Sequence, residues 1–353
     1  MHNRAKTLVI LSPAFPESEM PSNWVLSQQL FVKTLKEQYP GLNVLLYSFF
    51  YPYHTRTYTW NNVQVTSFDG MHRRKLRRVL LWKEIWLNLK TVQRENDLIG
   101  IFSFWCGECA LLGSYFAKYS AVKHYCWVCG QDARQSNKLV KFIRPRPQEL
   151  VAMSTFLAHE FYKNHGIKPQ HIIPNAIDSR QFPNTLPAVR DIDVLGVGSL
   201  ELQKQYQLFI TIVQSLKQTF PGIKTMICGS GPEKTKLELL IKDGGLEKNI
   251  YLSDLTPHND VMHLMQRTKL LLHPSAYEGF STVCLEALYA GAQVISFCDP
   301  MEGNIPNWHI VHSPEEMTNK ALELLHSVNM SYTPVLVYAM EDSVRAIMKL
   351  FGQ

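Results

Sequence analysis

Two glutamates flank a loop and the predicted start of a helix. Glu278 lies in a loop that follows an apolar strand, and Glu286 follows eight residues later, inside a largely apolar helix predicted over residues 281–290. A carboxylate can accept hydrogen bonds from both hydroxyls of a diol, and an unpartnered carboxylate in an apolar helix would be costly. The pair therefore favours a ligand with hydroxyl groups at both ends. A surface loop acid and a solvated helix residue are the structural alternatives.

The loop and the helix start between these glutamates suit a diphosphate. Gly279 lets the backbone approach a ligand closely. The free amides of the first helical turn, with the hydroxyls of Ser281 and Thr282 beside them, can hold an anion at the positive end of the helix dipole. In parallel sheets, ligands bind beyond the carboxyl ends of the strands, where such a helix begins.

Apolar strands alternate with amphipathic helices along both halves of the chain. The predicted strands cover residues 7–11 and 43–50 in the first half, and residues 192–198 and 223–228 in the second. This alternation is typical of a doubly wound parallel sheet. Because 353 residues are too many for one ordinary core, we expect an α/β chain with two Rossmann-like domains.

The composition indicates an ordinary globular protein. Apolar residues make up 46% of the chain and charged residues 19%, which excludes a disordered class. No run approaches the roughly eighteen apolar residues of a membrane span. Seven cysteines, an odd number, favour reduced thiols over a disulfide framework. A cytoplasmic enzyme is therefore the expectation.

Charge is distributed unevenly between the two halves. Residues 1–180 carry 23 basic and 12 acidic residues, a balance of +11, whereas the rest carries 13 and 18, a balance of −5. This asymmetry suggests two domains with different partners. The basic half suits an anionic membrane or an anionic acceptor.

A basic and aromatic segment over residues 72–87 is the candidate for membrane contact. Trp82 and Trp86 are four residues apart and share a helical face beside a cluster of cations. Such a segment suits the anionic inner face of a membrane. A core-packed helix with a solvated basic entry is the alternative.

Two cysteine pairs raise the question of a zinc site. Cys106 and Cys109 form one pair, Cys126 and Cys129 form another, and sixteen residues separate the pairs. This spacing is compatible with a four-thiolate zinc site. The second pair falls in a predicted strand, where positions three apart face opposite sides. Buried thiols that act as small apolar residues are therefore favoured.

The segment around the two glutamates resembles the Glu-x7-Glu signature of the retaining glycosyltransferases of family 4. The matching residues are Pro274, Ser275, Glu278, Gly279, Phe280, Glu286, Ala287, Gly291, Val294 and Ile295. Ser281 replaces the usual last glycine of the loop. Residues 174–178 are similar to the family's junction between domains, with Ala176 in place of glycine.

This resemblance implies the GT-B fold, in which two Rossmann-like, doubly wound parallel-sheet domains face a central cleft. It implies an acceptor-binding domain over residues 1–185 and a donor domain over residues 190–330. A C-terminal helix over residues 337–353 is expected to pack back on the first domain. The implied activity is transfer of a hexosyl group from a nucleotide sugar to a hydroxyl of a carbohydrate or lipid-linked acceptor, with retention of configuration. The implied setting is cell-surface polysaccharide or glycolipid assembly. No metal, no other cofactor and no nucleic acid is expected.

The resemblance also assigns roles in donor binding. Glu278 would orient the transferred sugar, and Glu286 would hold the ribose. Gly279, Phe280, Ser281 and Thr282 would line the donor site, and Lys204 would neutralise the diphosphate. The family usually has an arginine where this chain has Ser199, which offers only a neutral hydrogen bond.

A second departure lies in the first domain. Residues 129–132 are similar to a His-Gly-x-Asp turn of the family, but Cys129 stands in place of the histidine. Asp132 is retained, and it would contact sugar or acceptor hydroxyls as a catalytic group or serve as a helix N-cap. Two alternatives stay open, of which Ser199 and Cys129 motivate the first and the Glu278–Glu286 segment disfavours the second. One is a catalytically degenerate protein that binds a nucleotide sugar or a partner, and the other is a nucleotide-sugar epimerase.

Overall fold

The chain folds into two compact units, which are described separately. The computed structural model describes residues 4–20, 25–73, 76–183 and 189–353. Unit 1 comprises Met1–Asn175 and Met340–Gln353, and unit 2 comprises Ala176–Ala339. Both are α/β, with a central sheet that is largely or wholly parallel.

In the structure the boundary between the units follows Asn175. The sequence analysis places the end of the first domain at residue 185. Ile177 forms a parallel bridge with Ala339, and the ring of Phe182 packs edge-to-face on Tyr289. The segment after Asn175 therefore belongs to unit 2. Residues 184–188 lie outside the described part of the chain.

Unit 1 is built on an eight-stranded sheet with the order β3-β4-β2-β1-β5-β6-β7-β8. Neighbouring strands are parallel, except that β3 runs antiparallel to β4. The strands are β1 (Lys6–Ala14), β2 (Asn43–Tyr51), β3 (Thr55–Trp60), β4 (Val63–Phe68), β5 (Asp97–Phe104), β6 (Lys123–Val128), β7 (Leu150–Ala152) and β8 (His171–Ile172).

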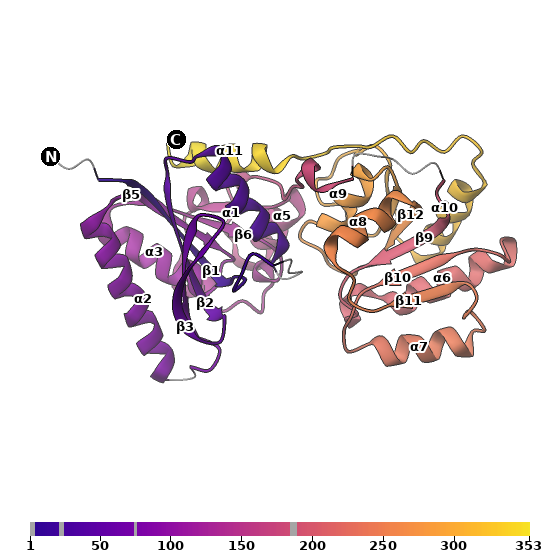
Figure 1. Ribbon diagram of the computed structural model, residues 1–353, viewed down its shortest axis with the longest axis horizontal. Helices are drawn as coiled ribbons and strands as arrows, with labels where there is room; N and C mark the ends of the chain where they lie inside the picture. The colour runs from indigo at the N-terminus through magenta and orange to yellow at the C-terminus, as the bar shows by residue number, and fades with distance from the viewer. Residues whose placement is uncertain (1–3, 21–24, 74–75, 184–188) are drawn as a thin grey trace. The chain divides into compact units, whose positions relative to one another are not determined.

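The helices of unit 1 cover both faces of this sheet. They are α1 (Leu26–Gln38), α2 (Leu76–Glu95), α3 (Glu108–Ser120), α4 (Val140–Ile143), α5 (Thr155–His165) and α11 (Met340–Leu350). The chain runs from β1 toward β2 and later from β5 toward β6 on the other side, so right-handed crossovers place α1 and α3 on opposite faces. Helix α2 packs beside α3, and α11 packs beside α1 (Figure 1).

Helix α11 shows why its sequence packs as it does. Met340, Val344, Ile347 and Met348 are buried, and their spacing places them on one face of the helix. Its last turn brings Phe351 against the rings of Phe102 and Tyr125. The C-terminal segment is thus part of the core of unit 1.

Unit 2 contains a six-stranded, all-parallel sheet with the order β11-β10-β9-β12-β13-β14. Its strands are β9 (Ile192–Val197), β10 (Thr225–Cys228), β11 (Ile250–Ser253), β12 (Thr268–His273), β13 (Gln293–Ser296) and β14 (Trp308–Ile310). Its helices are α6 (Tyr206–Thr219), α7 (Lys234–Asp243), α8 (His258–Gln266), α9 (Thr282–Tyr289) and α10 (Pro314–His326).

The strand order of unit 2 reverses between β9 and β12. From β9 the chain adds β10 and β11 on one side, and then returns to add β12, β13 and β14 on the other. From the carboxyl ends of β9 and β12 the chain therefore continues toward opposite ends of the sheet. In open parallel sheets this switch point is where ligands bind.

None of the described helices is long and apolar enough to cross a membrane. All seven cysteines are free thiols. Within the described residues, no cluster of three or more histidine, cysteine or acidic side chains has the arrangement to hold a metal ion. The spacing of the two cysteine pairs therefore does not produce a four-thiolate site.

Candidate functional site

The loops after β9 and β12 meet at the switch point of unit 2. The amide of Ala276 donates to the carbonyl of Gln203 at 3.0 Å, which joins the two loops directly. The turn after β10 packs against the first of them so closely that a Cβ on Gly229 would lie 1.9 Å from the carbonyl oxygen of Gly198. Gly229 therefore has a structural reason to be glycine.

An ion pair between Lys204 and Glu278 occupies this position. Lys204 ends a short 3-10 turn (Leu202–Lys204) ahead of α6. Its ammonium group contacts Glu278 Oε1, and each side chain is only 18% exposed. The structure therefore brings together two residues that are 74 positions apart and that the sequence assigns to the same ligand.

Two more side chains surround the Glu278 carboxylate. The hydroxyl of Ser275 donates to Oε1 at 3.0 Å, and Nε2 of the buried His273 lies 3.4 Å from the same oxygen. Burial would raise the pKa of Glu278, but His273 and Lys204 together lower it to about 2. Glu278 is therefore an ionised carboxylate, suited to accept hydrogen bonds from hydroxyl groups.

His273 is absent from the residues singled out in the sequence. It is the last residue of β12 and is 3% exposed. Its position at the carboxyl end of a central strand is the signal that identifies it, because side chains at that edge face the ligand region.

Helix α9 begins directly after this loop. Ser281 is its N-cap, and its hydroxyl accepts from the amide of Cys284 at 3.4 Å. Ser281 is buried, whereas Thr282, the first helical residue, is partly exposed. The helix start that the sequence predicts to bind an anion is thus the amino-terminal, positive end of an eight-residue helix.

Phe280 and Ser199 differ in their exposure to solvent. Phe280 is 6% exposed and stacks on Trp308 at 6.2 Å between ring centroids. It also contacts Tyr338 edge-to-face. Phe280 therefore packs beneath the loop, while Ser199 is exposed at the end of β9 and Gly279 is buried between Glu278 and Phe280.

Glu286 lies on α9 and is paired with a histidine. It is 6% exposed, and its Oε1 lies 2.7 Å from Nε2 of His258, the first residue of α8. Burial opposes a charge on His258, but the Glu286 carboxylate raises the pKa of His258 above its ordinary value. Nothing local in the sequence reveals this partner, because 28 residues separate the two.

Asp132 belongs to unit 1 and is held by backbone amides. One of its carboxylate oxygens accepts from Cys106 at 2.8 Å, and the other accepts from Gly130 at 2.7 Å and Cys129 at 3.1 Å. Burial raises the pKa of Asp132 although these bonds oppose the rise. Its carboxylate joins the loops after β5 and β6, and Gly130, not Asp132, caps the short turn that follows.

The cysteine beside Asp132 is a neutral thiol. Burial and the adjacent Asp132 carboxylate raise the pKa of Cys129 well above its ordinary value. Its sulfur donates to the carbonyl of Trp127 at 3.2 Å. Cys129 therefore offers neither the charge nor the second nitrogen of an imidazole.

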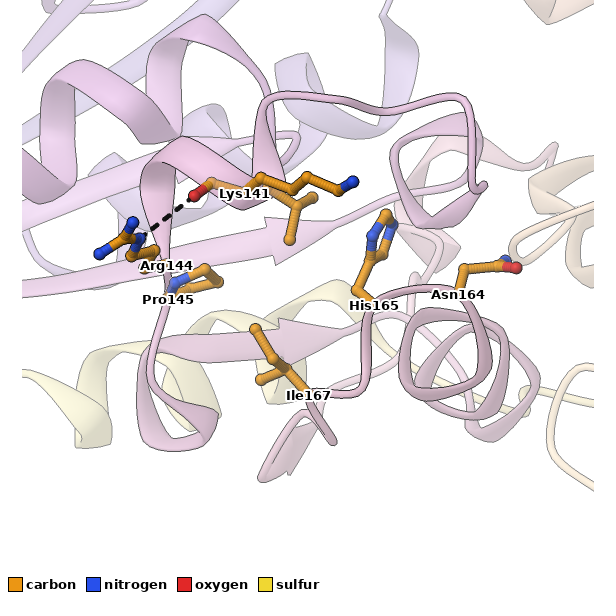
Figure 2. Close-up of a pocket in the computed structure, with 7 residues that line it drawn as sticks. Lys141, Arg144, Pro145, Asn164, His165 and Ile167 are labelled. Atoms are coloured by element: carbon orange, nitrogen blue, oxygen red, sulfur yellow. Dashed lines mark hydrogen bonds between the residues drawn. The ribbon is translucent and has the colours of Figure 1, made fainter.

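A pocket of about 280 Å³ lies elsewhere in unit 1, between α4 and the end of α5 (Figure 2). Its lining includes Lys141, Arg144, Asn164 and His165. No residue assigned a role from the sequence lines this pocket. It is therefore separate from the candidate site.

The match to a known family covers the part of unit 2 that holds the candidate site. Residues 178–305 match the family described as glycosyl transferases group 1. The phosphatidylinositol N-acetylglucosaminyltransferase gpi3 subunit of Schizosaccharomyces pombe is 27% identical over 165 residues, covering 46% of this chain and 36% of the relative. A glycogen synthase of Mycobacterium tuberculosis is 27% identical over 181 residues, covering 50% and 44%. The chain thus spans less than half the length of these curated relatives.

Solved structures resemble the whole chain at low identity. TarM aligns with a TM-score of 0.73 and 12% identity, covering 99% of both chains. Sucrose-phosphate synthase from Thermosynechococcus elongatus aligns with a TM-score of 0.70 and 14% identity, covering 99% and 97%. Anabaena HepE in complex with UDP and glucose aligns with a TM-score of 0.68 and 16% identity, covering 98% and 97%.

The fold of the chain is therefore that of the GT-B glycosyltransferases, as the sequence analysis predicts, and residues 178–305 match the glycosyl transferases group 1 family.

Proposed function

We propose that this chain transfers a sugar from a nucleoside diphosphate sugar to a hydroxyl acceptor, with retention of the anomeric configuration. The observation that carries the proposal is the Lys204–Glu278 pair at the start of α9, where the loops after β9 and β12 meet. A cation, a helix N-terminus and an ionised carboxylate therefore lie close to one another. This is the set of groups that a diphosphate linked to a sugar requires.

In this proposal the diphosphate binds Lys204 and the amides at the start of α9. Both would stabilise the negative charge that develops as the sugar leaves. Their positive charge offers a route to catalysis without a metal. Glu278 would exchange its contact with Lys204 for hydroxyls of the sugar, and the diphosphate would take over the ammonium group. Glu286 would accept hydrogen bonds from the ribose.

The acceptor and the biological setting are part of the same proposal. We assign the acceptor to unit 1, whose basic character suits an anionic or lipid-linked substrate. One relative acts, by its name, on phosphatidylinositol, which supports glycolipid assembly alongside polysaccharide assembly. UDP-sugars are the first donors to test, because HepE was solved with UDP and glucose.

A catalytically degenerate binder is the second candidate, and Ser199 favours it. Ser199 supplies no charge to a diphosphate, and losing a charged contact costs about 1.5–3 kcal/mol of binding. Cys129 is a neutral thiol in place of an imidazole. Both departures fall at positions where the resemblance implies contacts to substrate.

Product analysis separates these candidates. The full chain is incubated with UDP-glucose and UDP-N-acetylglucosamine, with and without a panel of hydroxyl acceptors, and the sugar products are followed by NMR. Release of UDP with an α-linked product from an α-linked donor supports the proposal. Nucleotide binding without turnover would leave only the degenerate binder, and a changed sugar on intact donor would indicate an epimerase.

A further inference from the structure

Helix α2 exposes an apolar face to solvent. Its core side is formed by Leu81, Ile85, Leu89 and Val92, which are all buried. On the opposite side Val79, Leu80 and Leu87 are 56%, 59% and 52% exposed. Leu80 and Leu87 are seven residues apart and therefore lie on the same face of the helix.

The two tryptophans of α2 do not form this face but pack inside unit 1, as the core-packed alternative of the sequence analysis has it. The indole nitrogen of Trp82 donates to Glu108 of α3 at 2.8 Å. Trp86 packs on the rings of Phe116 and Tyr119, also in α3. The tryptophans join α2 to α3, whereas the aliphatic residues Val79, Leu80 and Leu87 are exposed to solvent. Arg74 and Lys75 of the predicted basic segment lie outside the described residues.

Helices α3 and α4 continue the exposed surface. Tyr119 and Tyr115 of α3 are 59% and 51% exposed, and Phe142 of α4 is 63% exposed. The hydroxyl of Tyr115 donates to the carbonyl of Phe142 at 3.2 Å, which joins the two helices. We call the exposed apolar residues of α2, α3 and α4, with the cations beside them, the α2–α4 surface.

Cations are interleaved with these apolar side chains. The outer face of α2 carries Lys83, Lys90 and Arg94, and the exposed Glu95 ends the helix. Lys90 lies over the ring of Tyr119 at 5.0 Å, and Lys118 lies over Tyr115 at 5.8 Å. Lys141 flanks Phe142 on α4, and Figure 2 shows its ammonium group extending away from the backbone.

Two acidic residues near this surface, Glu84 and Glu108, have partners of their own. Glu84 forms an ion pair with Arg73. Glu108 accepts from Trp82 and lies 3.6 Å from Arg78. These carboxylates therefore leave the lysines of the α2–α4 surface available to an external anion.

We propose that the α2–α4 surface docks on an anionic lipid bilayer. Aliphatic and tyrosine side chains enter the interfacial layer, while lysines keep their ammonium groups at the level of the phosphates. A protein partner would need acidic groups set between apolar pockets, whereas a bilayer offers both over any area. The proposal does not rest on the glycosyltransferase assignment, because lipid binding needs no donor.

Vesicle co-sedimentation of the full chain tests this proposal. Vesicles of phosphatidylcholine are compared with vesicles that also contain phosphatidylglycerol. Each surface cation adds about a fivefold factor to the partition coefficient. The double variant Lys83→Gln and Lys90→Gln should therefore bind anionic vesicles about twenty-fivefold more weakly. Higher salt should weaken the wild type in the same direction.

A matched double variant controls for net charge. Lys236→Gln and Lys242→Gln remove two exposed cations from α7 of unit 2 and should leave vesicle binding unchanged. Leu80→Ser with Leu87→Ser should also weaken binding, whereas Leu239→Ser, at a site 56% exposed on α7, should not. Thermal unfolding of every variant verifies that it is folded.

Three outcomes would overturn the proposal. In the first, the wild type does not sediment with anionic vesicles. In the second, the α7 variants lose as much binding as the α2 variants. In the third, sedimentation velocity shows a wild-type dimer that Leu80→Ser with Leu87→Ser converts to monomer. That result would assign the surface to a second copy of the chain.

Discussion

His258 and Glu286 form a buried hydrogen bond of 2.7 Å between the first residue of one helix and the middle of another. It holds the carboxylate that we assign to the ribose in a fixed position at the amino-terminal end of α8. A carboxylate at such a depth would otherwise be costly to ionise. His258 is thus a positioning residue for Glu286 in our account.

The stability contributed by His258 should depend on pH in a defined direction. Because Glu286 raises the folded-state pKa of His258, the stabilisation is fully present below the unfolded pKa of about 6.5. It is lost as pH rises through the higher folded value. His258→Gln should therefore lower the unfolding free energy by about 1.5–3 kcal/mol at acidic pH and by less at alkaline pH.

Urea unfolding of the wild type and the variant across this pH range measures that difference. His309→Gln is the control, because burial lowers the pKa of His309, so its stabilising effect should instead grow as pH rises. An equal loss at both ends of the range for His258→Gln would show that the raised pKa plays no part.

Lys204 should act on the phosphates of a nucleotide and not on its nucleoside. Lys204→Met removes the cation beside Glu278 and should weaken binding of the nucleoside diphosphate roughly ten- to hundredfold. Affinity for the nucleoside alone should stay the same. Titration calorimetry with both ligands measures the two effects, with Lys236→Met as the control. Equal weakening of both ligands would contradict a phosphate role.

Phe280 should be a packing residue. It is buried between Trp308 and Tyr338, so Phe280→Ala should cost about 3–5 kcal/mol of unfolding free energy through the cavity that it leaves. Phe280→Leu should recover most of the stability and the nucleotide affinity of the wild type. Chemical unfolding and calorimetry test this together. A Phe280→Leu protein with normal stability but no nucleotide binding would instead identify a direct ligand contact.

Asp132 should stabilise unit 1 without affecting the donor. Its carboxylate accepts three backbone amides, and Asp132→Asn replaces one accepting oxygen with a donor. We expect a loss of roughly 2 kcal/mol or more of unfolding free energy and an unchanged nucleotide affinity. Unfolding and calorimetry of one preparation give both values. Lost turnover in a variant of full stability would restore a catalytic role.

Local sequence signals predict part of this site well. The loop with Glu278 and the start of α9 are identifiable because a strand end, a glycine and a capping serine fall within one short segment. The resemblance assigns Lys204 and Glu278 to one donor site, but their ion pair and the neighbouring strands that bring their loops together appear only in the structure.

Other features depend on contacts between distant segments, which the sequence does not reveal. The partner of Glu286 depends on how α8 packs on α9, and no spacing in the sequence predicts that this partner is His258. One of the three amides that bind Asp132 belongs to Cys106, in the loop after β5, which is 26 residues away in the sequence. Trp82 and Trp86 share a helical face as expected, but only the structure shows that α3 covers that face. The solvent face of α2 therefore appears only in the structure.

Titration of the full chain with uridine, guanosine, adenosine and thymidine diphosphates tests the central claim, a donor site in unit 2, most directly. We predict saturable binding of at least one nucleotide to the wild type and a loss of roughly tenfold or more in Glu286→Gln, which keeps the shape of the side chain but not its charge. If no nucleotide binds, or if Glu286→Gln binds as tightly as the wild type, the donor site is not where we place it.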